Sequence, residues 1–148
     1  MRVQDILRAN NAKLVVISPD VSIHQAAAMI ADEQVGMLLV VDARGVLVGL
    51  LSERDIVRFI AARGNDALAS GVSAAMAEIG LIVSPEDPVA DVMRQMANQR
   101  ARHLPVVSEH KLVGVISIGD ILNSRLAEKD QEAAVLRDIA RGSLVAAA

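Results

Sequence analysis

The sequence predicts a mixed α/β (α+β) fold in which one β-α-β-β-α unit is present twice in tandem. Residues 15–42 align with residues 81–108 at an offset of 66, and Leu47–Ile56 aligns with Leu112–Ile121 at an offset of 65. In both copies the apolar residues change between strand spacing and helical spacing in the same order. Because a unit of about 60 residues buries little surface alone, we expect the two copies to pack with pseudo-twofold symmetry around one core.

The aliphatic composition limits which core and which functions are possible. Hydrophobic residues make up 53% of the 148 residues and aromatic residues only 1%, with no Cys, Trp or Tyr. The lack of Cys excludes disulfides, thiolate nucleophiles and Cys-ligated metals. The lack of aromatic platforms and the net charge of −3 disfavour nucleic-acid binding. No secretory signal and no run of ~20 apolar residues is evident, so we expect a cytoplasmic protein without a membrane span.

Short apolar runs bounded by turn residues predict the strands. Each copy opens with a β-rich run, at Leu14–Ile17 in the first and Leu81–Val83 in the second. Two strands joined by a turn then follow in each copy, at Met37–Val41, Val46–Leu51, His103–Val107 and Leu112–Ile116. Pro105 cannot donate a ladder hydrogen bond, which favours a sheet edge or a strand end for its run.

A helix is predicted between the opening run and the hairpin of each copy. Apolar residues recur there at i, i+3, i+4 and i+7, namely Ile23, Ala26, Ala27 and Ile30, and Val89, Val92, Met93 and Met96. Ser22 with Gln25 resembles a capping box, and Asp87 before Pro88 indicates an N-cap followed by proline at the first helical position. A second helix follows each hairpin.

The remaining segments are a linker and a tail. Ala62–Ser70 is the predicted linker, with Gly64 and Gly71 as breakers. From Ser124 the chain is charged and favours helix as far as Gly142, and this tail either packs on the body or pairs with a second chain. Its apolar stripe consists of Leu126, Val135, Leu136 and Ile139. The predicted divisions are 1–66 for the N-terminal segment and first copy, 67–127 for the linker and second copy, and 128–148 for the tail.

The densest identity between the copies is a Gly–apolar–apolar–Ser–x–x–Asp motif, at Gly49–Asp55 and Gly114–Asp120. Ser at the start of a helix with an acid three residues later is typical of a capping box. The same groups suit an anionic ligand, because a helix N-terminus offers free N–H groups and partial positive charge to a phosphate. A carboxylate three residues on can accept both hydroxyls of a ribose. The two interpretations are compatible until a ligand binds.

The tandem repeat, the Ser-Pro dipeptide that opens each copy and the duplicated motif together resemble a CBS-domain pair, also called a Bateman module. The dipeptides are Ser18-Pro19 and Ser84-Pro85, and the segment Arg102–Val106 is also typical of the second copy in this family. The resemblance covers roughly residues 3–127. It implies a stand-alone protein of two CBS repeats with a C-terminal helix.

The resemblance also implies a ligand and its contacts. Such modules bind adenine nucleotides (AMP, ADP, ATP or NAD(H)) or S-adenosylmethionine in two clefts between the repeats. Asp55 and Asp120 would hold ribose hydroxyls, and Ser52 and Ser117 would face the phosphate. Residues just before each hairpin would line the base and phosphate: Val35, Gly36, Met37, Ala101, Arg102 and His103. The last two of these would supply positive charge in one cleft, and Arg54 in the other.

The chain departs from the family pattern before the second repeat and between its copies. The family often has Thr after the Met that precedes the second repeat, whereas here Met76 is followed by Ala77, so one hydroxyl of the candidate site is lost. The equivalent position in the first repeat is near Arg8. Arg54 aligns with Gly119, so we predict two unequal ligand sites.

The function that the resemblance implies is a regulatory module for energy sensing, which signals to a protein partner by a conformational change. Family modules usually dimerise through helical faces, so we expect a homodimer, parallel or antiparallel. Residues on the second helices would supply the interface: Ile56, Val57, Phe59, Ile60, Ile121 and Leu122. Two alternatives stay open, a ligand-free dimerisation or interaction module and an S-adenosylmethionine sensor.

Catalysis and metal binding are not expected. Ser52 has no adjacent His base, and no general acid–base pair is evident, so we expect no enzyme activity and no catalytic cofactor. His24 and His110 are expected at the surface, and no two histidines have metal-ligand spacing.

Overall fold

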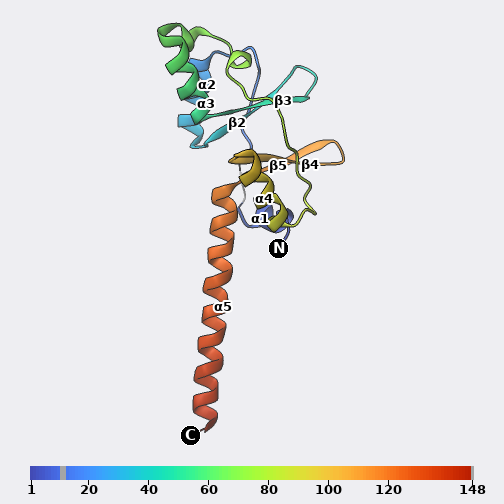
Figure 1. Ribbon diagram of the computed structural model, residues 1–148, viewed down its shortest axis with the longest axis vertical. Helices are drawn as coiled ribbons and strands as arrows, with labels where there is room; N and C mark the ends of the chain where they lie inside the picture. Colours follow the sequence, from blue (N-terminus) through green and yellow to red (C-terminus); the bar gives the residue numbers. More distant parts are fainter. Residues whose placement is uncertain (11–12, 148) are drawn as a thin grey trace. The chain divides into compact units, whose positions relative to one another are not determined.

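The fold consists of two similar α+β units, which the computed structural model describes for residues 1–10 and 13–147, with side chains up to residue 142. Figure 1 follows the helices and strands along the chain. In order, they are α1 (Val3–Asn10), β1 (Val16–Ile17), α2 (Ile23–Glu33), β2 (Met37–Val41), β3 (Leu47–Ser52), α3 (Glu53–Arg63), η1 (Gly64–Ala69), η2 (Val72–Ala74), α4 (Val89–Gln99), β4 (His103–Ser108), β5 (Lys111–Ser117) and α5 (Ile118–Ala147). The predicted hairpin strands are confirmed to within one residue at each end.

Each unit combines one repeat with the segment that precedes the other repeat. One unit is Ala12–Ile82, and the other consists of Met1–Asn11 and Val83–Ala148. In the unit that contains α1, Val3 at the start of this helix donates its N–H to the carbonyl of Asp87 at 3.1 Å. In the unit Ala12–Ile82, Val72 at the start of η2 donates its N–H to the carbonyl of Val21 at 2.8 Å. Both Val3 and Val72 are fully buried, so each preceding segment is part of its unit's core.

The unit Ala12–Ile82 holds a three-stranded sheet in the order β1-β2-β3. β1 pairs with β2 in parallel, and β2 pairs with β3 antiparallel with a bulge at Val40 and Val41. α2 packs against β2, and α3 packs against β3 and α2. The core is aliphatic, as the composition predicts, and its buried members include Ile17, Ile23, Ala26, Ile30, Leu38, Val40, Leu51, Ile56 and Val72.

The other unit has a two-stranded sheet of β4 and β5, and the predicted strand Leu81–Val83 is reduced to a single parallel bridge between Val83 and Val106. The alignment explains this correction. In the first unit the N–H of Leu39 donates to the carbonyl of Val15 at 2.9 Å. Pro105 takes the position of Leu39 and has no N–H, so the equivalent bond cannot form.

The start of α4 corrects a second prediction. Pro88 is the N-cap of α4 and no side chain caps this helix, so Asp87 is not the N-cap. The Asp87 carboxylate instead accepts the N–H of Ser84 at 2.8 Å, which closes the Ser-Pro turn before the helix. The capping box of Ser22 and Gln25 at the start of α2 is confirmed.

The linker and the tail are more regular than predicted. Residues of the linker form the 3-10 helix η1, which packs against α2 and α3 and buries Ala67 completely. Gly64 ends α3 with φ at +66°, as a breaker does. The predicted C-terminal helix is present, but it is the continuation of the helix that follows β5, and it passes through Gly142.

Candidate functional site

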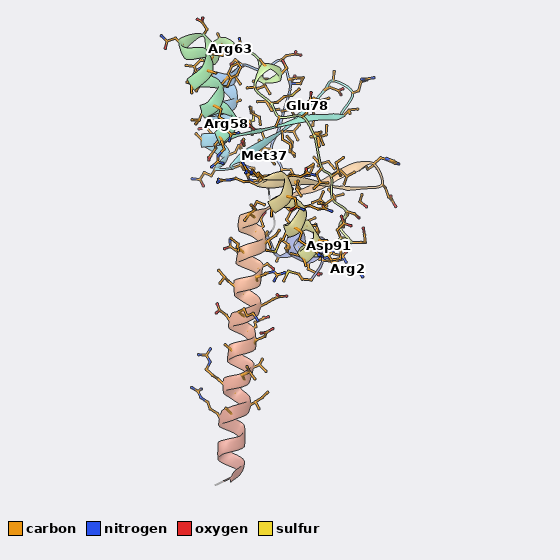
Figure 2. All side chains as sticks on the ribbon, in the orientation of Figure 1. Arg2, Met37, Arg58, Arg63, Glu78 and Asp91 are labelled. Atoms are coloured by element: carbon orange, nitrogen blue, oxygen red, sulfur yellow. The ribbon has the colours of Figure 1, made fainter. Side chains whose placement is uncertain are left out.

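In the unit Ala12–Ile82 the first motif places five residues around the N-terminus of α3. Ser52 is the N-cap, and its backbone N–H and hydroxyl both donate to Oδ2 of Asp55, at 2.9 and 2.8 Å. The N–H of Asp55 returns a bond to the Ser52 hydroxyl at 3.1 Å. Met37 lies opposite Ser52 in the β2–β3 ladder, and Glu53 donates its N–H to the carbonyl of Gly36 at 3.1 Å. The residues predicted to line one site therefore lie together, and Figure 2 shows Met37 at the start of β2.

The second motif repeats this arrangement at the N-terminus of α5. Ser117 donates its N–H to Oδ2 of Asp120 at 2.8 Å, and Asp120 donates its N–H to the Ser117 hydroxyl at 3.0 Å. His103 lies opposite Ser117 in the β4–β5 ladder, and Ile118 donates its N–H to the carbonyl of Arg102 at 3.0 Å. The predicted residues of the second repeat are thus also brought together.

The turn that leads into each hairpin has the same conformation in both units. Gln34 and Arg100 end α2 and α4 in the left-handed region, with φ of 55° and 52°. Val35 and Ala101 follow them, and each donates its N–H to the carbonyl five residues earlier, at 3.3 and 3.0 Å. This turn reverses the chain so that Val35 and Ala101 stand immediately before the site residues on β2 and β4.

The glycine of each motif lies under the segment that precedes the other repeat. A Cβ at Gly49 would lie 2.6 Å from Sδ of Met76 and 3.0 Å from the carbonyl oxygen of Ala77. A Cβ at Gly114 would lie 2.7 Å from Cδ2 of Leu7 on α1. This role of Leu7 and Met76 was not predicted, although the glycine shared by both copies of the motif is a signal for it.

Ala77 and Arg8 differ in backbone structure although they are equivalent in sequence. Ala77 and Leu50 exchange two backbone hydrogen bonds, of 3.0 and 2.8 Å, which add Ala77 to the edge of β3 two residues before Ser52. Arg8 instead continues α1. The two candidate sites therefore differ in backbone structure as well as in residue type.

The exposure of the candidate residues suits contact with a solute. The Ser and Asp of both motifs are half-buried, as are Val35, Met37, Ala101 and His103, while Gly36, Arg54, Ala77 and Arg102 are exposed. Among the described residues no polar or charged side chain is fully buried. His24 and His110 are exposed, as predicted, and the described part of the chain contains no cluster of potential metal ligands.

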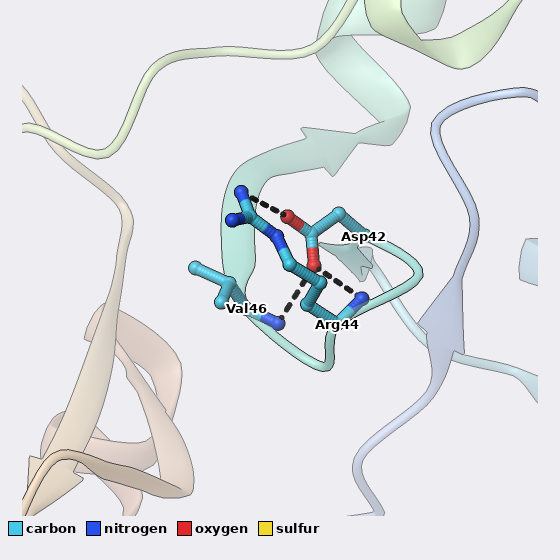
Figure 3. Close-up of polar contacts among 3 residues, drawn as sticks. All are labelled: Asp42, Arg44 and Val46. Atoms are coloured by element: carbon cyan, nitrogen blue, oxygen red, sulfur yellow. Dashed lines mark hydrogen bonds and ion pairs between the residues drawn. The ribbon is translucent and has the colours of Figure 1, made fainter.

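The carboxyl groups with lowered pKa lie outside the motifs. Asp42, in the turn between β2 and β3, accepts the N–H of Val46 at 3.0 Å and that of Arg44 at 2.9 Å (Figure 3). The Val46 bond is the main cause that lowers the pKa of Asp42, and the N–H and charge of Arg44 act in the same direction. A hydrogen bond from the Ser84 hydroxyl lowers the pKa of Glu86. Both groups are structural parts of turns.

Comparison with known proteins identifies the family. The CBS domain family model matches residues 3–62 and 72–127, and each match contains one copy of the motif. The chain belongs to the CBS domain family. It carries two tandem CBS repeats, and such pairs are typically regulatory, non-catalytic modules.

Relatives of similar length are CBS domain-containing proteins. The CBS domain-containing protein YhcV of Bacillus subtilis is 30% identical over 123 residues, which cover 83% of this chain and 86% of YhcV. The crystal structure of a CBS-domain containing protein from Agrobacterium tumefaciens has a TM-score of 0.80 and 35% identity, covering 84% of this chain and 92% of that chain.

Two further CBS structures contain adenosine ligands. A CBS domain protein from Pyrobaculum aerophilum in complex with AMP has a TM-score of 0.71 and 28% identity, covering 81% of this chain and 89% of that one. The CBS domain pair of protein MJ0100, in complex with 5′-methylthioadenosine and S-adenosyl-L-methionine, has a TM-score of 0.73 and 25% identity, covering 88% and 98%. In the described residues of the present chain, no helix is both long and apolar enough for a membrane span.

Proposed function

We propose that this CBS pair is a cytoplasmic regulatory module that binds adenine nucleotides, namely AMP, ADP, ATP or NAD(H), and signals to a protein partner by a conformational change. The observation that carries the proposal is the duplicated junction, in which Ser and Asp stand at a helix N-terminus beside the hairpin residues. A helix N-terminus favours a phosphate, and the AMP complex of a CBS relative supplies the ligand class.

Asp55 and Asp120 are the proposed ribose contacts. The N–H and the hydroxyl of Ser52 both donate to Oδ2 of Asp55. Neither of these hydrogen bonds uses Oδ1, so this oxygen can accept a ribose hydroxyl. In the second repeat Ser117 also bonds to Oδ2 of Asp120. The capping bond and a ribose bond can therefore coexist on one carboxylate, because each of its oxygens carries its own lone pairs.

The two proposed sites are unequal in charge. Arg102 and His103 flank Ser117, whereas Gly36 and Met37 flank Ser52, where the nearest proposed cation is Arg54. We propose that the site at α5 takes the ligand with more phosphate charge and that the site at α3 takes a mononucleotide. Two identical and independent AMP sites in a calorimetric titration would contradict this part of the proposal.

Asparagine substitutions separate capping from ligand binding. In Asp55→Asn and Asp120→Asn, the amide oxygen can still accept the serine N–H, but the amide nitrogen cannot accept a ribose hydroxyl. Hydrogen bonds to a charged group contribute about 1.5–3 kcal/mol, so we expect each variant to lose affinity about tenfold or more at one site. Isothermal titration with AMP, ATP, NADH and S-adenosylmethionine measures this loss.

A matched control and two contrary outcomes complete the experiment. Gln25→Ala removes an acceptor of the Ser22 capping box at α2, outside both motifs, so it should lower thermal stability and leave affinity unchanged. If the wild-type protein binds none of the four ligands, the nucleotide proposal fails and the ligand-free interaction module stands in its place. If the double Asn variant binds them unchanged, Asp55 and Asp120 are not the ribose contacts and the proposed sites are wrong.

S-adenosylmethionine sensing is the second candidate, because the similar MJ0100 pair is in complex with this compound. The same titrations distinguish the two. Tighter binding of S-adenosylmethionine than of AMP, lost in both Asn variants, would favour the second candidate over the first.

The homodimer stays a prediction, and the structure restricts its interface. Ile56 and Ile121 are buried within their own units and cannot contribute to an exposed face. Val57, Ile60 and Leu122 are exposed and remain available. We propose that these residues belong to the helical faces through which the repeats dimerise.

A further inference from the structure

The later part of α5 is an exposed helix that its own unit does not cover. α5 contacts α1, α4 and β5 near its start, where Ile121 is buried and the Ser124 hydroxyl approaches Sδ of Met1 at 3.4 Å. From residue 125 to residue 142 every side chain is exposed except that of Ala134, which is half-buried. Figures 1 and 2 show this part of α5 with no other element of its unit beside it. In proteins most of the stability of a helix comes from packing of its apolar face and not from helix propensity, so a packing partner would stabilise this part of α5.

This part of α5 also lies largely beyond the CBS repeats. The family match to the second repeat ends at residue 127, while α5 continues to Ala147. The fold of the repeats therefore does not account for residues 128–147. We therefore infer the partner of this segment from the residues of the segment itself.

Those residues contain a heptad seam. Positions with alternating spacings of four and three residues lie along one side of the helix: Leu122, Leu126, Lys129, Ala133, Leu136 and Ala140. This is the spacing of the a and d positions of a coiled coil. Leu122, Leu126 and Leu136 are 51%, 63% and 66% exposed. Burial of these side chains against a partner would remove their apolar surface from water, which is favourable.

Lys129 is the polar member of the seam, and its ammonium is already directed to the helix surface. It forms an ion pair with Glu132 at 3.3 Å on the same helix. Its aliphatic stem can therefore line the seam while its charge stays in water. A single polar residue in a coiled-coil seam limits stability and helps to set the register of the helices.

The charges beside the seam match those of a second copy in parallel register. In a parallel coiled coil each g position faces the e position five residues later on the partner helix. Arg125 at g would face Asp130 at e, and Glu132 at g would face Arg137 at e. Both pairs have opposite charge, and the symmetry of a dimer forms each of them twice.

We propose that residues 122–140 of α5 bind the same segment of a second copy of this chain as a parallel two-stranded coiled coil. The apolar seam contributes the buried area, and the flanking charges specify the partner and the orientation. This contact is separate from ligand binding; it shares Leu122 with the helical face proposed for the second repeat, and the rest of the seam lies beyond that face. With two Ala and one Lys among six seam positions, the dimer should dissociate reversibly on dilution.

A seam variant and an off-seam variant of equal chemistry test the proposal in the full chain. Leu136→Glu places a charge in the seam, whereas Val135→Glu places the same charge one residue earlier, at a side chain that is 56% exposed and off the seam. We expect Leu136→Glu to raise the dimer dissociation constant about tenfold or more and Val135→Glu to leave it unchanged, as measured by sedimentation. Circular dichroism of both variants checks that the repeats stay folded.

Disulfide trapping tests the orientation, because the natural chain contains no Cys. In parallel register Leu136→Cys lies opposite itself and should form a cross-linked dimer under mild oxidation, and Val135→Cys should not. A monomeric wild type, or a double variant Leu126→Glu with Leu136→Glu whose dimer dissociation constant equals that of the wild type, would overturn the coiled coil. Cross-linking between Leu126→Cys and Leu136→Cys chains, without Leu136→Cys self-pairing, would overturn the parallel orientation.

Discussion

At the scale of single residues, the motif glycines show why the two copies share a residue that is not among the proposed ligand contacts. Gly49 and Gly114 leave room for Met76 and Leu7, which come from segments distant in sequence. The motif therefore combines two constraints. Its Ser and Asp act locally at a helix start, and its Gly permits a close tertiary contact.

Alanine substitutions at these glycines should be costly and unequal. Gly49→Ala should lower the free energy of unfolding by about 1–3 kcal/mol, because the new Cβ meets a backbone oxygen as well as Met76. Gly114→Ala should cost less, since it meets the mobile end of Leu7. Gly142→Ala is the control: nothing lies within 4 Å, so in helix α5 it should be neutral or stabilising by up to about 1 kcal/mol. Urea unfolding measures all three, and equal losses at Gly49 and Gly142 would contradict the steric account.

At the scale of elements, the β2–β3 hairpin is held by its turn as well as by its ladder. The ionised Asp42 carboxylate accepts two backbone N–H groups of the turn, and Gly45 has the positive φ of +80° that the turn requires. The register of the hairpin therefore depends on the protonation state of Asp42. The same register places Met37 opposite Ser52.

The Asp42 turn predicts a pH dependence at acid pH. The folded pKa of Asp42 lies below the ordinary value of 3.8, so the turn's contribution is fully present above that value and is lost as pH falls through the folded pKa. Carboxyl chemical shifts followed by NMR should give a midpoint below 3.8. In Asp42→Asn this pH-dependent contribution should disappear. A wild-type midpoint at or above 3.8 would contradict the stabilising role of the Val46 and Arg44 bonds to Asp42.

At the scale of the whole molecule, each unit contains the segment that precedes the other repeat. α1 completes the unit of the second repeat, and η2 completes the unit of the first. Val3 and Val72 have the same role in the two units, since each is fully buried and bonds to the opening turn of a repeat. A substitution in one of these segments should therefore act on the unit that contains it and not on the repeat that it precedes.

Val3→Ala and Val72→Ala test this assembly as a matched pair. Truncating a buried Val leaves a cavity and weakens the unit that contains it. In hydrogen exchange, Val3→Ala should increase exchange of the β4 and β5 amides more than of β2 and β3, and Val72→Ala should do the reverse. If both variants accelerate exchange equally in both units, opening is global and the assignment of these segments to separate units is wrong.

Local patterns predicted much of the fold and of the candidate sites. The hairpin strands, the helices and two capping boxes follow rules that span a few residues, and these rules also bring Ser52 and Asp55 together. The candidate ligand residues of each repeat could be grouped because most of them lie on one hairpin and one helix start. One error lies at an element end, where Asp87 accepts the N–H of Ser84 and does not cap α4.

The sequence by itself determined that the chain repeats one unit twice, that its core is aliphatic and that each copy carries a Ser and an Asp at a helix start. Only the tertiary structure decided which preceding segment completes which repeat, why each motif needs Gly, and how Pro105 reduces a predicted strand to one bridge. The physical reason is the distance along the sequence between the residues that interact. Hydrogen-bond patterns of helices and turns depend on neighbours in sequence, whereas close packing and sheet pairing depend on residues that only folding brings together.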